Sequence, residues 1–234
     1  PFNLRPIYLC VFAIILGMGS INGQHLNTLT ATLDGTNKDI YIQQQFVYVN
    51  DSNDSLPELF FNDWPQAYSN KNTALAKRFA EEFKKGLHLA KSHERGSTTI
   101  LSVVDDGHSG LSWERTRQKD IIKLSLNESL APKDSIKIFI TYRVKLPPNK
   151  FTPFGYDNRN NYYLKDWYLT PAVYSDGKWS LYSNKNLEDL YTGITNTEIT
   201  FNYPKGLFLA SNLTEVSNSN AAFLKQSFLE GVNG

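Results

Sequence analysis

The sequence contains a single cysteine, Cys10, among 234 residues. An internal disulfide framework and a zinc site built from cysteines are therefore excluded. The chain also lacks an excess of charge of either sign, because 24 Lys and Arg residues stand against 23 Asp and Glu residues. Proteins that bind nucleic acids, or that use a polybasic surface on membranes, need surplus positive charge. The composition argues against both classes and leaves an aromatic-rich chain whose hydrophobic content of 41% is enough for a folded core.

The apolar run over residues 7–19 is too short to span a bilayer, which takes roughly 20 apolar residues. Arg5 precedes this run, and the small or polar residues 20–24 follow it. A basic start, a short apolar stretch and a small-residue exit are typical of a secretory signal peptide. We therefore predict a signal peptide over residues 1–23 and export of the remaining chain to the periplasm, the cell surface or the exterior. No membrane contact is expected other than through the signal peptide.

Alternating apolar and polar residues indicate that much of the remaining chain forms β-strands. In residues 135–146, for example, Ile140, Tyr142 and Val144 alternate with Thr141 and Arg143. This two-residue period is typical of a half-buried antiparallel strand. Similar runs, separated by turn-forming clusters such as Asp176-Gly177, predict strands over residues 26–33, 39–50, 56–62, 98–104, 121–126, 172–182 and 198–203. The sequence therefore predicts a mainly β fold, a β-sandwich or a curved antiparallel sheet, with one or two short helices.

One amphipathic segment predicts a helix over residues 73–85. Leu75, Phe79 and Phe83 share one face of it, and charged residues occupy the opposite face. Asn72 or Thr73 is suited to cap its start. Gly86 is expected to end the helix in the left-handed conformation.

Residue patterns for catalysis or metal binding are sparse. His88 and His93 would lie about 140° apart on a helix, so they do not form the pair of an H-E-x-x-H zinc motif. Residues 107–110 (GHSG) are one residue short of the G-x-S-x-G of serine hydrolases. The acidic loops 51–55 and 157–161 lack the glycine and the distant glutamate of an EF-hand calcium loop. Polar loops and turns between strands account better for all of these segments.

The densest aromatic cluster comprises Tyr162, Tyr163, Trp167, Tyr168, Tyr174, Trp179 and Tyr182. Aromatic faces stack on sugars, but they are also what a β-sandwich core or a domain interface buries. We favour burial in the core or at an interface, and a carbohydrate-binding platform is the alternative.

Several segments, in this order along the chain, resemble the N-terminal domain of aminopeptidase-N-like zinc metallopeptidases. Residues 48–61 (YVNDSNDSLPELFF) resemble that family's strand–turn–strand "Y-x-N-x-S…L-x-x-L-x-F", and residues 64–68 (WPQAY) follow it as in the family. Residues 166–179 (DWYLTPAVYSDGKW) are similar to "Q-W-Y-P-x-x-A-V-Y-x-x-x-G-W" of bacterial members, and residues 187–191 (LEDLY) stand in place of their "G-E-F-Y". Residues 198–211 (EITFNYPKGLFLAS) resemble "V-x-I-x-x-P-K-x-Y-V-V-A-A-T-G".

This resemblance implies that residues 24–220 form a saddle-shaped, largely antiparallel β-domain that precedes a thermolysin-like catalytic domain, and that residues 221–234 begin the next element. In the family, zinc is held by the two His of H-E-x-x-H and a downstream Glu. This sequence has no H-E-x-x-H, and its one Met, in the predicted signal peptide, leaves none for the family's G-x-M-E-N loop. We therefore expect the chain to be inactive alone, with zinc bound in a catalytic domain of the same polypeptide.

The resemblance also implies two substrate-binding residues. In the family, a Gln and an acidic residue of the N-terminal domain face the free amino group of the peptide, and the corresponding positions here are Asp166 and Tyr168. Asp166 retains an oxygen acceptor for an ammonium group, whereas Tyr168 departs from the acidic residue. A strand-end aspartate in a turn beside core aromatics is an equally good interpretation.

The predicted function is therefore that of a non-catalytic domain of an exported zinc metallopeptidase. It would cap the catalytic domain and shape the substrate entrance, with that domain and a peptide as its partners. Two alternatives remain open: an exported carbohydrate-binding β-sandwich, and the scaffold domain of a family member that has lost its zinc ligands.

Overall fold

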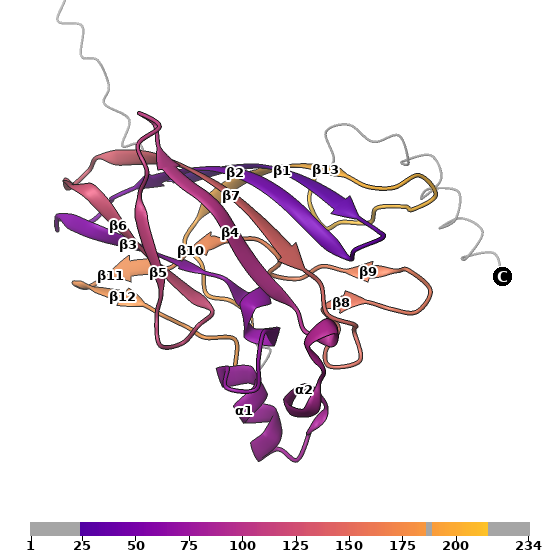
Figure 1. Ribbon diagram of the computed structural model, residues 1–234. Coiled ribbons are helices and arrows are strands. Elements are labelled where there is room, and N and C mark those ends of the chain that lie inside the picture. The colour runs from indigo at the N-terminus through magenta and orange to yellow at the C-terminus, as the bar shows by residue number, and fades with distance from the viewer. Residues whose placement is uncertain (1–23, 186–188, 215–234) are drawn as a thin grey trace, which may run out of the picture.

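The computed structural model describes residues 24–185 and 189–214, and two β-sheets dominate this part of the chain (Figure 1). The larger sheet has five strands in the order β13-β1-β2-β7-β4. Their bounds are Thr195–Asn202, His25–Asp34, Asp39–Val49, Ser135–Lys145 and Ser97–Asp105. The smaller sheet has four strands in the order β10-β3-β6-β5, with bounds Thr170–Pro171, Leu56–Asn62, Ile121–Leu130 and Ser112–Arg115.

Two short hairpins accompany the sheets. One pairs β8 (Gly155–Tyr156) with β9 (Tyr162–Tyr163), and the other pairs β11 (Val173–Ser175) with β12 (Lys178–Ser180). The second hairpin corrects the single strand expected over residues 172–182. Asp176 and Gly177 both adopt positive φ, 53° and 74°, and so reverse the chain there.

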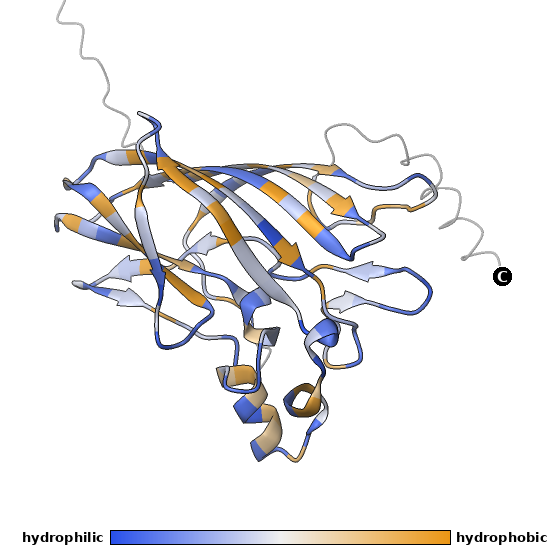
Figure 2. Ribbon diagram, in the orientation of Figure 1, coloured by the Kyte–Doolittle hydropathy of each residue, from blue (hydrophilic) through white to orange (hydrophobic). Residues whose placement is uncertain are grey.

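The alternation of apolar residues determines which faces of the large sheet are buried. In the pairing of β2 with β7, Ile40 lies opposite Val144 and Phe46 lies opposite Ile138, and all four side chains are buried. Every strand pairing in the described residues is antiparallel except that of β1 with β13, which is parallel. The predicted mainly β fold is confirmed, and Figure 2 shows the alternating hydropathy along the strands.

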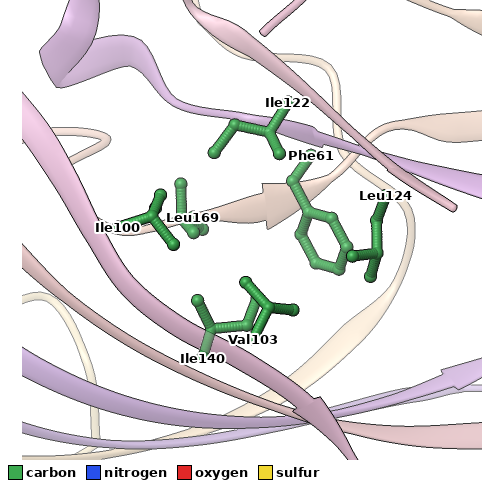
Figure 3. Close-up of a pocket in the computed structure, with 7 residues that line it drawn as sticks. All are labelled: Phe61, Ile100, Val103, Ile122, Leu124, Ile140 and Leu169. Atoms are coloured by element: carbon green, nitrogen blue, oxygen red, sulfur yellow. The ribbon is translucent and has the colours of Figure 1, made fainter. Parts of the chain in front are cut away.

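The two sheets pack against each other through an apolar core. Figure 3 shows a cavity of about 10 Å³ in this core, lined by Phe61, Ile100, Val103, Ile122, Leu124, Ile140 and Leu169. Such a volume barely admits one water molecule, and an apolar lining offers that water no hydrogen bond. The cavity is therefore a packing defect and not a ligand site.

The helices lie at one end of the molecule (Figure 1). They are the 3-10 helix η1 (Trp64–Tyr68), α1 (Ala74–Glu81), α2 (Gly86–Leu89) and the 3-10 helix η2 (Ser92–Glu94). Thr73 caps α1 as expected, because its side chain accepts a hydrogen bond from the Ala76 N–H at 3.3 Å. The expected stop at Gly86 is wrong, since Gly86 begins α2.

Helix α1 ends earlier, at Glu81, and Phe83, the residue after its C-cap, adopts the left-handed conformation with φ 61°. The Phe83 N–H donates to the Ala80 carbonyl at 3.1 Å, and the Lys84 N–H donates to the Phe79 carbonyl at 2.7 Å. This is the hydrogen-bond pattern of a Schellman motif, with Phe83 at the position where glycine is usual.

The predicted signal peptide, residues 1–23, and the last predicted segment, 221–234, lie outside the described residues. Within residues 24–185 and 189–214, no helix is long and apolar enough to cross a membrane.

Candidate ligand cleft

The described chain contains a cleft of about 860 Å³. It lies between η1, the β8–β9 hairpin and the segment that follows β13. Its lining is rich in aromatic side chains: Trp64, Tyr68, Phe154, Tyr162, Tyr163, Phe201, Tyr203 and Phe208. A volume of this size and an aromatic lining with a few polar groups are typical of small-molecule or peptide-end binding sites.

Asp166 places a carboxylate in this cleft. The residue is half-buried, and burial raises the pKa of its side chain, although Lys165 opposes the shift. No residue in the described ranges donates a hydrogen bond to this carboxylate. Its backbone adopts φ 48°, a left-handed conformation that aspartate tolerates better than most residues. The cleft thus contains a negatively charged hydrogen-bond acceptor that receives no hydrogen bond from the residues that the structure describes.

The position of the Asp166 segment is determined by a buried clamp on the backbone of Leu169. The Leu169 carbonyl accepts from the Gln44 side-chain amide at 2.8 Å, and the Leu169 N–H donates to the Tyr142 hydroxyl at 3.0 Å. The Tyr142 hydroxyl in turn donates to the Gln44 oxygen at 2.6 Å, and Gln44 also donates to Asn27 at 2.8 Å. Two hydrogen bonds therefore attach this loop to the large sheet, and two more between buried side chains of the sheet hold the groups that make them.

Tyr168, the second predicted substrate residue, does not line the cleft. It is half-buried, its hydroxyl hydrogen-bonds the side chain of Thr197 on β13, and its ring meets Trp167 edge-on at 5.2 Å. Burial raises the pKa of the Tyr168 hydroxyl, and so does the nearby charge of Asp166. The structure therefore places Asp166 in the cleft and Tyr168 beside it, against the sheet.

The cleft has further polar groups, Tyr68 and Thr152, which the sequence analysis did not propose as binding residues. Tyr68 and Thr152 share a hydrogen bond of 2.8 Å between their hydroxyls. Burial raises the pKa of Tyr68 to about 12. Tyr68 ends the WPQAY segment that resembles the metallopeptidase family, and this was the one available signal.

The wall of the cleft at Asn184 is held by a buried carboxylate, Asp120. Asp120 accepts hydrogen bonds from the Ser183 hydroxyl, at 2.7 and 2.8 Å to its two oxygens, and from the Asn184 N–H at 2.8 Å. Burial raises the pKa of Asp120 to about 6, and the charge of Asp63 contributes to the shift. Asp63, also buried, pairs with Arg115 at 2.7 Å.

The predicted aromatic cluster is dispersed. Trp167 is buried, and Trp179 packs against Tyr48, Phe60 and Tyr174 at centroid distances of 6.0, 5.4 and 5.1 Å. Among the described residues, Tyr163 and Tyr182, 44% and 52% exposed, are the only members of the cluster that are more than partly exposed. A broad platform of coplanar, solvent-facing rings is therefore not formed by this cluster within the described residues.

The acidic loops are explained by local hydrogen bonds. Asp157 accepts from the backbone N–H groups of Arg159 and Asn161 at 2.8 and 2.9 Å, which closes the turn of the β8–β9 hairpin. Asn50 is buried and donates through its amide to three backbone carbonyls. Within the described parts of the chain, no group of three His, Cys, Asp or Glu residues could hold a metal ion.

No model of a known protein family matches this sequence, and no curated protein matches it. Among solved structures, the chain is similar to an M1 zinc metallopeptidase from Deinococcus radiodurans, with 10% identity and a TM-score of 0.31 over 53% of this chain and 20% of that one. It is also similar to yeast LTA4 hydrolase in complex with Bestatin, with 13% identity and a TM-score of 0.27 over 50% of this chain and 14% of that one. The chain thus aligns with a fifth or less of these structures, and TM-scores this low assign no family.

Proposed function

We propose that residues 24–220 form a non-catalytic β-domain of an exported, aminopeptidase-like zinc metallopeptidase. In this proposal the domain caps a catalytic domain of the same polypeptide and shapes the substrate entrance. The observation that carries it is the aromatic cleft with the half-buried carboxylate of Asp166. The resemblance of five sequence segments to the N-terminal domain of that family supports it.

The chemistry of the cleft suits a cationic amine attached to an apolar group. A carboxylate that is partly removed from water and has no donor among the described residues gains from an ammonium, because charge-assisted hydrogen bonds are stronger than neutral ones. The aromatic walls would hold an apolar side chain beside the amine. The free amino end of a peptide has both features.

Zinc chemistry is not proposed for the described residues. They contain no group that fits a zinc site, and the sequence has no H-E-x-x-H. Zinc would belong to the proposed catalytic domain, and we derive no step through it here.

The amine proposal is tested by comparing phenylalanine amide with its N-acetylated form, using titration calorimetry on the full chain. We expect the free amine to bind and the acetylated compound to bind at least about tenfold more weakly, since the charge-assisted hydrogen bond is lost. Asp166→Asn should produce a similar loss. Binding should also weaken on acidification, at a pH above the usual pKa of an aspartate, because Asp166 must be ionised to hold an ammonium.

Asp176→Asn is the matched control, because Asp176 has a similar φ of 53° but lies in the β11–β12 turn. It should bind the amine like the parent. Equal binding of free and acetylated compounds would contradict amine recognition. The wider proposal is tested by sequencing the coding region past Gly234, where an H-E-x-x-H and a downstream Glu are expected, whereas zinc ligands missing there would favour the scaffold alternative.

A carbohydrate-binding role is less well supported. Such a module needs several exposed rings in one plane, and the cluster over residues 162–182 places Trp167 and Trp179 against other aromatic side chains instead. A glycan-binding screen would test this alternative directly.

A further inference from the structure

Residues 71–95 form a helical projection at the end of the molecule away from the sheets (Figure 1). Helices α1 and α2 pack against each other in it, and the connection between them, residues 82–85, lies at its far tip. Leu75, Phe79 and Leu87 are buried and attach the projection to the body of the protein. The projection is therefore a stable, outward-pointing structure.

The projection presents two large apolar side chains to solvent, one at its tip and one at the end of α2. Phe83 is 86% exposed and Leu89 is 73% exposed, the first and third most exposed of the large hydrophobic residues in the described chain. Phe83 also adopts φ 61°, which is an outlier for a bulky side chain and is held by the Schellman hydrogen bonds at the end of α1. The Phe83 side chain is largely exposed, and glycine would end the helix there without strain. A strained residue of this kind suggests a role in contact with another molecule.

The projection is strongly basic although the chain is nearly neutral. Residues 71–95 hold seven Lys and Arg residues against three Glu residues, a net charge of +4, whereas the whole chain carries +1. Glu82 is neutralised by Arg78 and Lys84, and Glu94 by Lys150. Exposed lysines that form no ion pair with any described residue remain along the projection: Lys71, Lys77, Lys85 and Lys91.

We propose that this projection docks on the surface of an anionic phospholipid membrane, with Phe83 and Leu89 inserted among the headgroups. Unpaired lysines beside protruding aromatic and aliphatic side chains match the charge and polarity of such an interface. A protein partner fits less well, because the buried centres of protein interfaces are depleted of lysine. The even charge balance of the whole sequence conceals this local excess.

The test uses site-specific labels on the full chain. In a Cys10→Ser background, Phe83→Cys, Leu89→Cys and Leu101→Cys each receive an environment-sensitive fluorophore. Leu101 on β4 is 60% exposed and serves as the control for an exposed leucine outside the projection. Vesicles of phosphatidylcholine with and without phosphatidylglycerol are then added, with brominated lipids as quenchers.

We expect labels at 83 and 89 to shift to the blue and to be quenched only when phosphatidylglycerol is present, and the label at 101 to remain unchanged. The apolar run over residues 7–19 is common to all three proteins, so any binding that it causes does not distinguish the labels. Labels at 83 and 89 that stay in water while the chain binds vesicles would overturn the proposal, and so would an equal response to neutral vesicles. The second outcome would indicate apolar adsorption without the lysines, and the first would leave a protein as the occupant.

Charge reversal gives an independent measurement on the otherwise unaltered chain. Each lysine near an anionic surface raises the partition coefficient about fivefold, so Lys77→Glu with Lys85→Glu should lower it by at least about 25-fold. Lys178→Glu, an exposed lysine on β12, should have a much smaller effect. Equal effects of the double and control variants would refute docking through the projection.

Discussion

Replacing Asp120 by asparagine should change how the stability of the protein depends on pH. Asp120 is 1% exposed, and its pKa is raised from 3.8 to about 6 by burial, although Ser183 and Asn184 donate hydrogen bonds to it. The folded state therefore holds a proton at Asp120 over a pH range in which the unfolded state has released it. The contribution of Asp120 to the unfolding free energy is therefore greatest below about pH 4. It is lost as the pH rises through about 6.

The size of the effect follows from the shift in pKa. A pKa that moves from 3.8 to about 6 corresponds to about 3 kcal/mol of stability lost on deprotonation. Asparagine fits the site without loss of hydrogen bonds. Its carbonyl can accept from the Asn184 N–H, and its NH₂ can donate to the Ser183 hydroxyl, which accepts as well as donates.

Urea unfolding followed by tryptophan fluorescence, at several values between about pH 4 and about pH 8, measures this difference. We expect Asp120→Asn to gain about 3 kcal/mol of unfolding free energy relative to the parent across that range. Titrating groups that do not interact with Asp120, such as Glu94 with its pKa of about 2, are common to both proteins and cancel, whereas Asp63, whose charge acts on Asp120, contributes to the difference. A difference that stays flat with pH would refute the reasoning, and a difference of opposite sign would mean that the hydrogen bonds stabilise the carboxylate more than burial penalises it.

Two further predictions concern the folded state. Phe83→Gly should raise the unfolding free energy by about 1 kcal/mol, because glycine adopts the left-handed conformation at φ 61° without strain; thermal unfolding should show a Tm about 2–4 °C higher. Gln44→Leu should lower the unfolding free energy by about 3 kcal/mol, since it leaves the Tyr142 hydroxyl and the Leu169 carbonyl short of a partner. Urea unfolding would contradict the second prediction if it showed a loss no larger than for Leu101→Ala on the surface.

The large sheet was accessible to prediction because one of its faces is buried. Where one face of a strand is covered, apolar residues must recur with a period of two, and the pairing of β2 with β7 carries this pattern over its whole length. The parallel pairing of β1 with β13 was not predicted, because it joins segments 170 positions apart, as the register of His25 with Thr195 shows. Alternation identifies strands but does not identify their neighbours.

The cleft was accessible only in part, because irregular loops have no period. In a strand, Asp166 and Tyr168 would point to the same side. The chain is instead left-handed at Asp166, with φ 48°, so only the first of the two residues lines the cleft. Similarly, Gly86 was expected to end α1, but the hydrogen bonds of Phe83 and Lys84 close the helix three positions earlier. A propensity for positive φ predicts where a chain is able to turn, and packing decides where it does.

Features that oppose local stability occur around the cleft and at the tip of the projection. Around the cleft they are a desolvated carboxylate at Asp120, a half-buried one at Asp166 and a left-handed backbone at Asp166. At the tip the feature is Phe83, exposed and left-handed where glycine would be more stable. The strands of the large sheet, in contrast, combine β-forming residues with the expected burial. Folding alone does not require these features, and residues that oppose stability persist where another task requires them. At the cleft these features coincide with a ligand-sized cavity, and at the tip with an exposed apolar side chain, so binding is to be sought there, an amine in the cleft and a lipid surface at the tip.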